Sequence, residues 1–297
     1  MAYRFTPFVL PMRAPWQGSL FERLPNRLVK EARCRMMRSR FPALIWDNVP
    51  EQMSPATRVW LRSAFVPLAQ RVFDRTSRRF WLTWLSDDSL NQLKRFILVF
   101  DQTGQPIAWA AAGAFEVDGR RCFYGSSAGV DPAWQGSGIT SSAARHLFLP
   151  ALGAAAPRTL YAVVRTGNPL VYSAWKAGQV GRQPIYPALD GREPPAAIAA
   201  IAREAADRLG HGDRLDPTTL IMRDCYNDEA AGLWSKRPPC DDDTVGRWFN
   251  DNLTAHDGVM MVVPFDPAAT FAQESMRLVQ KRLGLNTGRS SRRASAA

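Results

Sequence analysis

The stretch GVDPAWQGSGIT, residues 129–140, decides how this sequence is interpreted. It holds three glycines and a glutamine, and it joins a strand-like run to an alanine-rich run of helical character. Glycines leave the backbone open, and the first N–H groups of a helix have no partner within it, so the turn indicates a phosphate cradle. It is not a P-loop, because no Lys-Ser/Thr pair follows the second glycine of QGSG. A plain strand-to-helix joint is the alternative.

The runs around this turn alternate between strand and helix. Three strand-like segments directly precede it, and the turns that connect them are short enough for an antiparallel meander. A dinucleotide fingerprint would instead open a βαβ unit. We expect strands at 41–47, 95–101, 106–117, 121–130, 158–165, 179–187 and 257–266. We expect helices at 21–40, 54–85, 141–156, 169–178, 194–210 and 267–284, with a break near Pro25, Ser54 as an N-cap, and a kink or split at Pro67. The order predicts a mixed α/β (α+β) fold.

Composition narrows the class of protein. The chain has 297 residues, 46% of them hydrophobic, yet no apolar run reaches the roughly 20 residues of a membrane span, and no signal peptide is visible. The four cysteines and three histidines are scattered, so we expect no disulfide framework and no metal, and a cytoplasmic location. The net charge of +11 favours an acidic partner.

The charge is uneven, and it suggests how the chain is divided. We expect a basic N-terminal extension at 1–40, one catalytic or binding domain at 41–285, and a disordered basic tail at 286–297. Within the domain, a long polar insert covers about 187–256 before the last strand.

Two blocks of sequence resemble the GNAT superfamily of acyl-CoA-dependent N-acyltransferases. The family's cofactor motif reads Gln/Arg-x-x-Gly-x-Gly/Ala, and Gln135, Gly138 and Thr140 occupy its three fixed positions, with Thr140 a departure. Some thirty residues later, a strand, Asn168 and a short helix closed by Gly178 resemble the second block. The resemblance covers roughly 95–190, with 41–75 and 257–266 beside it.

The resemblance implies a cofactor site. The GNAT sheet is mixed, mostly antiparallel and splayed at the cofactor strand, and the pantetheine arm of acyl-CoA fills the opening like an added strand. By this likeness, Ala128 and Val130 bond the pantetheine amides, the N–H groups of 135–140 hold the pyrophosphate, and an N–H near Ser127 or Ala128 polarises the thioester. The implied site comprises Ala128, Gly129, Val130, Gln135, Gly136, Ser137, Gly138, Ile139, Thr140, Asn168 and Trp175.

The implied reaction is direct attack of an amine on the thioester, for which a proton acceptor and a group that stabilises the leaving thiolate are useful. Relatives often carry a tyrosine seven residues after the asparagine, but that position is Trp175 here. Tyr172, one turn earlier, is the candidate acid, unless it packs the helix on the sheet. Glu116 is the candidate base or a solvated hairpin residue, and Tyr124 and Ser126 are candidates to order a catalytic water.

Several functions stay open. The leading one is an N-acyltransferase, most simply with acetyl-CoA, whose acceptor amine is unknown and is acidic or nucleic-acid-linked if the charge is a guide. The alternative is a GNAT-like module that binds nucleic acid or protein with little or no transfer. A transferase for long acyl chains is a third. The insert aromatics Tyr226, Trp234, Trp248 and Phe249 either stack on a substrate or form a small core of their own.

Overall fold

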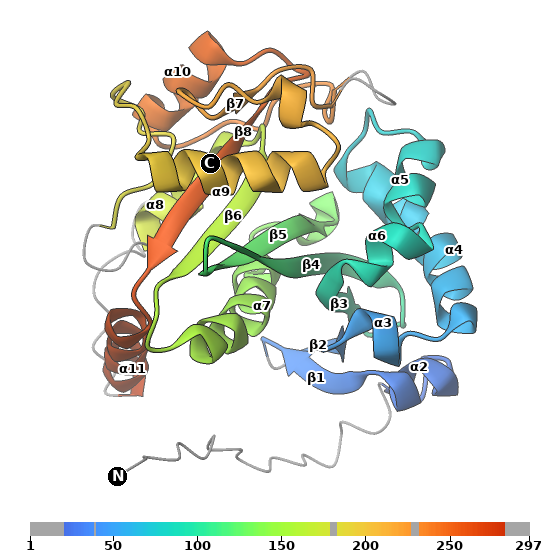
Figure 1. The fold of residues 1–297 in the computed structure, drawn as a ribbon. Coiled ribbons are helices and arrows are strands. Elements are labelled where there is room, and N and C mark those ends of the chain that lie inside the picture. Colours follow the sequence, from blue (N-terminus) through green and yellow to red (C-terminus); the bar gives the residue numbers. More distant parts are fainter. Residues whose placement is uncertain (1–20, 39, 179–182, 227–231, 283–297) are drawn as a thin grey trace, which may run out of the picture.

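An eight-stranded sheet forms the centre of the molecule (Figure 1). The structure is a computed structural model that describes residues 21–38, 40–178, 183–226 and 232–282. The strand order is β1-β2-β3-β4-β5-β6-β8-β7. Neighbouring strands are antiparallel except β5 and β6, which are parallel. The strands are β1 (Arg33–Met37), β2 (Phe41–Trp46), β3 (Leu93–Phe100), β4 (Pro106–Val117), β5 (Arg120–Val130), β6 (Leu160–Thr166), β7 (Ile221–Met222) and β8 (Gly258–Phe265).

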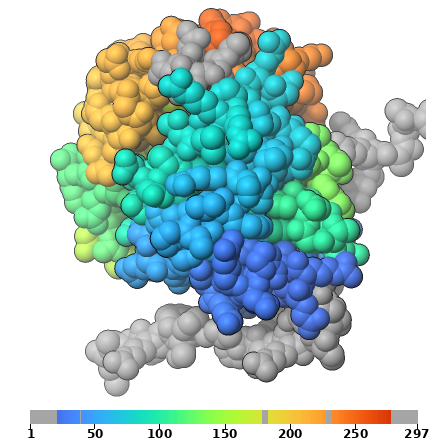
Figure 2. All heavy atoms as spheres, turned by 90° about the vertical axis from the view of Figure 1, so that its right-hand side faces the viewer, coloured from blue at the N-terminus to red at the C-terminus, as the bar shows by residue number. Residues whose placement is uncertain are grey.

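Helices cover both faces of the sheet. The described helices are α2 (Asn26–Glu31), α3 (Val49–Gln52), α4 (Pro55–Val72), α5 (Arg78–Trp84), α6 (Asp87–Asn91), α7 (Ile139–Ala155), α8 (Pro169–Gly178), α9 (Ala196–Arg208), α10 (Asp243–Asn252) and α11 (Pro267–Arg282). We call one side the α7 face, because α7, α8 and α10 pack there in one core. The other side is the α9 face, where α4 and α5 pack on β2–β4 and α9 packs on β6 and β8. Figure 2 shows the blue and cyan segments, which include α4 to α6, covering one side of the molecule.

Strand alternation decides which residues enter each core. Successive side chains of a strand point to opposite faces. In β4, Ile107, Ala108, Ala110 and Ala112 belong to the α7 core, whereas Trp109 and Ala111 belong to the α9-face core. The predicted mixed α/β fold and the antiparallel meander of β3, β4 and β5 are confirmed.

The basic N-terminal segment differs from its prediction. We expected a basic helix over 21–40 with a break near Pro25. Helix α2 does begin directly after Pro25, but it ends at Glu31, and β1 follows it as an edge strand paired with β2. Arg33 and Arg35 face solvent from that strand, while Met37 is buried. A charged edge strand of this kind discourages pairing with other chains. The domain boundary suggested after residue 40 therefore separates two paired strands; residues 1–20 and the tail at 286–297 lie outside the described residues.

Other local expectations are met in part. Ser54 caps α4 by accepting a hydrogen bond from Thr57 N at 3.2 Å, as predicted, but α4 runs through Pro67 to Val72. The strand expected at 179–187 is wrong for its described part, where only Tyr186 forms an isolated bridge, to Val262. The insert is more ordered than its polarity suggests, since it contributes α9, β7 and α10.

Candidate active site

The sheet opens between β5 and β6. Their parallel pairing runs from Arg121–Leu160 to Gly125–Val164 and goes no further. Beyond it, β5 continues to Val130 along β4, and β6 continues to Thr166 along β8. A bulge in β5 accompanies the separation, because Ala111 pairs with Ser127 whereas Ala112 pairs with Gly125, which leaves Ser126 as the extra residue. We call this opening the splay.

The backbone of β5 presents alternate residues to the splay. Asp131 N donates to Ile107 O at 2.8 Å, so residue 131 bonds toward β4. In an antiparallel pair, alternate residues direct both backbone groups to the same edge. Gly129 and Ser127 therefore also face β4, whereas Val130 and Ala128 face the open edge. Unpaired backbone groups in a sheet call for a partner, so Ala128 and Val130 are placed to bond an added strand-like ligand.

The turn after β5 has the geometry of an anion cradle. Gly136 and Gly138 have φ of +77° and +78°, a left-handed conformation that strongly favours glycine, and Gly138 is the N-cap of the 17-residue helix α7. Gln135 N and Ser137 N donate within the turn, to Pro132 O and Trp134 O, both at 3.3 Å. The expected cradle of six N–H groups is thereby reduced to Gly136, Gly138 and the first turn of α7.

Arg38, from the β1–β2 connection, meets this turn. A methyl group placed on Gly138 would lie 3.0 Å from Arg38 Nε and 3.1 Å from Arg38 Cζ. The described part of the chain offers Arg38 no ion pair, although its guanidinium lies beside the positive end of the α7 dipole. The hydroxyl of Ser137 is also buried without a partner there. The Arg38 guanidinium, the positive end of the α7 dipole and the unpaired Ser137 hydroxyl together would suit a phosphate group.

Gly129 is required by packing. A Cβ at this position would lie 2.6 and 2.8 Å from Cζ3 and Cζ2 of Trp109, whose ring crosses the strand in the α9-face core. Trp109 Nε1 donates to Ser127 Oγ at 3.0 Å, which fixes that hydroxyl beneath the splay. The predicted site residue Gly129 therefore allows the indole of Trp109 to pack directly against β5.

Residues of the second sequence block cap the start of α8 and pack this helix against its neighbours. Asn168 Oδ1 accepts from Leu170 N at 2.9 Å, so its side-chain oxygen caps α8. Trp175 is half-buried and packs edge-on against Phe148 and Phe265, with ring centroids 5.9 and 5.7 Å apart. Ile139 is buried in the α7 core, and Thr140 is exposed at the first turn of α7.

Tyr172 lies in the core. Its hydroxyl donates to Pro187 O at 2.9 Å, its ring meets that of Phe249, and 4% of the residue is exposed. Burial raises the pKa of Tyr172 above its ordinary value, with a smaller contribution from nearby carboxylates. The structure supports the packing alternative for Tyr172, and we do not propose it as the acid.

The other predicted catalytic residues separate into two groups. Glu116 is exposed, pairs with Arg121 at 3.4 Å, and lies five residues, about 17 Å of strand, from the splay residue Ala111. Glu116 is therefore too distant to act as the base. Tyr124 and Ser126 lie at the start of the splay. Burial raises the pKa of Tyr124, partly offset by Arg165, so its phenol is neutral near pH 7.

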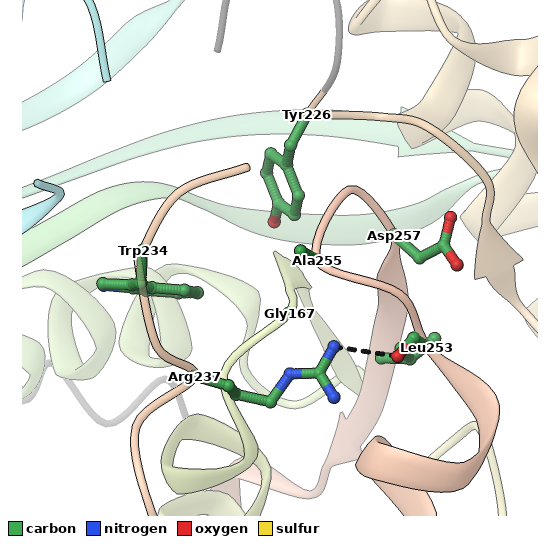
Figure 3. Close-up of a pocket in the computed structure, with 7 residues that line it drawn as sticks. All are labelled: Gly167, Tyr226, Trp234, Arg237, Leu253, Ala255 and Asp257. Atoms are coloured by element: carbon green, nitrogen blue, oxygen red, sulfur yellow. Dashed lines mark hydrogen bonds between the residues drawn. The ribbon is translucent and has the colours of Figure 1, made fainter. Parts of the chain in front are cut away.

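Sequence reasoning missed Arg165 and the pocket beside it. Arg165 is the first residue of β6 beyond the part that pairs with β5. Its Cζ lies 4.9 Å from the ring centroid of Tyr226. Tyr226 also lines a pocket of about 190 Å³ (Figure 3). The lining residues are Gly167, Tyr226, Trp234, Arg237, Leu253, Ala255 and Asp257. A lone arginine in an apolar strand was the only sequence signal.

The insert builds most of this pocket. Arg237 Nη2 donates to Leu253 O at 3.0 Å (Figure 3). Asp257, which is 3% exposed, accepts from Arg223 Nη1 and Thr254 N. Trp234 lines the pocket, whereas Phe249 is fully buried in the α7 core with Trp248 against it. The insert aromatics thus divide between a surface cavity and the core.

Two searches of the described residues found nothing. No helix among them is long and apolar enough to cross a membrane. They contain no group of three or more histidine, cysteine or acidic side chains arranged for a metal ion.

Known proteins resemble the chain in fold. No protein-family model and no curated protein matches it. Among solved structures, it is similar to the ribosomal-protein-S18-alanine N-acetyltransferase of Escherichia coli, with 14% identity, 52% of this chain and 86% of that chain covered, and a TM-score of 0.31. It is similar to Naa20 of Chaetomium thermophilum with a bisubstrate analogue (15%, 69% and 84%, TM-score 0.36). It is also similar to a GNAT family acetyltransferase of Brucella melitensis with acetyl-CoA (16%, 41% and 74%, TM-score 0.31).

At such identities and TM-scores, the assignment of the fold rests on the chain itself. The meander β3–β5, the parallel but splayed pair β5–β6, and the glycine turn into α7 are the features that the resemblance implied. The sheet topology is therefore the one that the sequence resemblance to the GNAT superfamily implied.

Proposed function

We propose that the protein is an acyl-CoA-dependent N-acyltransferase, with acetyl-CoA as the simplest donor. The observation that carries the proposal is the continuity of the splay and the cradle. The open backbone edge at Ala128 and Val130 leads along β5 directly into the left-handed glycines of the turn. A ligand with a strand-like amide arm and a pyrophosphate would satisfy both parts at once.

Each part of the donor has a place under this proposal. The pantetheine amides bond Ala128 and Val130, and the pyrophosphate binds the N–H groups of Gly136, Gly138 and the first turn of α7. Arg38 adds a charge-assisted contact to a phosphate, which is stronger than a neutral one. The side-chain oxygen of Asn168 is engaged as a helix cap, so we assign Asn168 to positioning α8 and leave the arm to β5.

The reaction is an acyl transfer between sulfur and nitrogen. The neutral amine forms a bond from nitrogen to the thioester carbon, the carbon–sulfur bond breaks, and the electron pair leaves on the thiolate of coenzyme A. The N–H of Ala128, which faces the splay, donates to the carbonyl oxygen as negative charge develops on it. Ser127 is excluded from this role, because its N–H faces β4.

Proton transfer is assigned to ordered water. The described residues place no carboxylate of the predicted site at the splay, since Glu116 lies at the far end of β4. The amine attacks in its neutral form, and the proton that its nitrogen loses as the carbon–nitrogen bond forms passes to water held by Tyr124 and Ser126 at the start of the opening. Tyr124, neutral near pH 7, is a hydrogen-bond donor there and not a base.

Calorimetric titration tests the donor site. Acetyl-CoA, octanoyl-CoA and free coenzyme A are titrated into the wild type, Gly138→Asp and Arg38→Gln, with Arg40→Gln as a matched control. Arg40 belongs to the same connection, but its guanidinium lies over Phe41, 4.7 Å from the ring centroid. We expect micromolar binding that Gly138→Asp abolishes, Arg38→Gln weakens and Arg40→Gln preserves. Absence of binding by all three ligands to folded wild type would refute the proposal.

The acyl preference in the same titration separates the acetyl from the long-chain donor. Salt-dependent binding of RNA, together with no binding of acyl-CoA, would instead support the nucleic-acid-binding module suggested by the net charge of +11.

A further inference from the structure

Arg165 is a half-buried cation at the mouth of the splay. In the register of the pair, Tyr124 faces Val163 and Gly125 faces Val164, so Arg165 is the residue that would come next, opposite the bulged Ser126. Its Nη1 lies 3.5 Å from Cys225 O, and its Cζ lies over the ring of Tyr226.

The described residues around Arg165 carry no opposite charge. The groups that face it are the phenols of Tyr124 and Tyr226 and the thiol of Cys225. Burial raises the pKa of Cys225 to about 11 and that of Tyr226 still higher, so all three are neutral at pH 7. No carboxylate in the described part of the chain forms an ion pair with Arg165. Among the described residues this partly buried charge has no counter-ion, which is unfavourable, so an anion from outside the chain would be bound here.

The side of the sheet on which Arg165 lies indicates whether the anion would belong to the donor or to the acceptor. Alternation along β6 puts Arg165 on the same side as Val163, in the α9-face core with Met260 and Tyr226. The phosphate cradle begins α7, which packs on the other face. If the donor arm passes through the splay from the α7 face, its thioester meets Arg165 on the α9 face. This is the side from which an acceptor would approach.

The adjoining pocket limits the size of the acceptor. Tyr226 links the two features, because it carries Arg165 over its ring and also lines the pocket of about 190 Å³ (Figure 3). Sites for drug-sized ligands are roughly 300–1,000 Å³. The space therefore suits a compact molecule, and the planar guanidinium suits a carboxylate.

We propose that Arg165 binds a carboxylate of the acceptor, and that the acceptor is a small molecule with both an amine and a carboxylate, as in an amino acid. This proposal rests on the acyltransferase function proposed above. The carboxylate would pair with the guanidinium, which orients the amine toward the thioester carbon at Ala128.

Matched acceptors test the charge directly. Leucine, methionine and phenylalanine are compared with their amides, which keep the α-amine but lack the carboxylate, by following the release of the coenzyme A thiol from acetyl-CoA. The variants are Arg165→Gln, Arg165→Lys and the control Arg158→Gln, which removes an exposed arginine just before the other end of β6. O-Phosphoethanolamine and ethanolamine form a further pair that detects a preference for phosphate.

We expect the wild type to use at least one amino acid with a kcat/KM tenfold or more above that of its amide. Arg165→Gln should lower kcat/KM for the amino acid ten- to hundredfold, the range for a lost charge-assisted hydrogen bond, while the amide changes less than threefold. Arg165→Lys should recover part of the loss, and Arg158→Gln should match the wild type.

Three results would overturn the proposal: equal use of acid and amide by the wild type, equal losses for both in Arg165→Gln, or acceptance only of phosphate or uncharged amines. A wild type that binds acetyl-CoA but acetylates no member of the panel would also contradict the assignment. Calorimetry of acetyl-CoA with each variant keeps the two levels separate. Failure of the wild type to bind it refutes the acyltransferase function itself, whereas unchanged binding in Arg165→Gln shows that the variant is folded and that its defect concerns the acceptor.

Discussion

Alanine at Gly136 and at Gly138, one at a time, separates backbone strain from crowding of the cradle. The two residues have nearly the same φ, +77° and +78°, so each substitution carries a similar left-handed strain of about 1–2 kcal/mol. Their surroundings differ. A Cβ on Gly136 meets no atom within 4 Å, whereas a Cβ on Gly138 lies 3.0 Å from Arg38 Nε. The free energy of unfolding should therefore fall by about the same amount in both variants, because the flexible guanidinium gives way.

Binding should distinguish them. If a phosphate lies between Arg38 and the turn, Gly138→Ala displaces the guanidinium and loses about 1.5–3 kcal/mol, which is a roughly ten- to hundredfold increase in Kd for acetyl-CoA. Gly136→Ala should lose less than Gly138→Ala. Urea unfolding gives the stability, and calorimetry gives Kd. Equal Kd values for the two variants, or a larger loss in Gly136→Ala, would refute the placement of a phosphate beside Arg38.

Three further substitutions test the supports of the site. Gly129→Ala places a Cβ against the ring of Trp109, so urea unfolding should show a loss of about 1–3 kcal/mol from overpacking; a wild-type midpoint would contradict that contact. Tyr172→Phe removes a buried donor to Pro187 O and should lower stability by about 1–3 kcal/mol while kcat changes little; loss of the alkaline limb of kcat would restore Tyr172 as the acid. Asp257 is held by Arg223 and backbone donors, which lower its pKa although burial opposes them. Its stabilisation is present above the unfolded pKa of about 3.9 and lost as pH falls through the lower folded value, so Asp257→Asn should be less stable at pH 7 and show a smaller acid loss in urea midpoints.

Local patterns were enough to predict the glycine turn and the sheet around it. Gly136 and Gly138 adopt positive φ, a conformation that favours glycine in a turn. The meander follows from short turns between apolar runs. The position of Ala128 and Val130 at the open edge also follows, because alternation along β5 is a local property.

Long-range placement was not predictable in the same way. Glu116 is near the site in sequence, but the direction of β4 carries it to the hairpin end of the sheet, away from the splay. The segment of Arg33 and Arg35 was interpreted as a helix from its charge, whereas its partner strand β2 fixes it as an edge strand. Arg165 contacts Cys225 across 60 residues of sequence, so nothing near it in the chain reveals its neighbours in the fold.

Site-resolved hydrogen–deuterium exchange of the β5 amides tests the central claim, that the splay receives the donor's arm. The account predicts that acetyl-CoA slows exchange at Ala128 and Val130, whose N–H groups face the opening. Exchange at Phe123 and Tyr124, which lie where β5 is already paired on both edges, should remain unchanged. Binding of acetyl-CoA with no added protection at Ala128 and Val130, or protection confined to another part of the sheet, would contradict it.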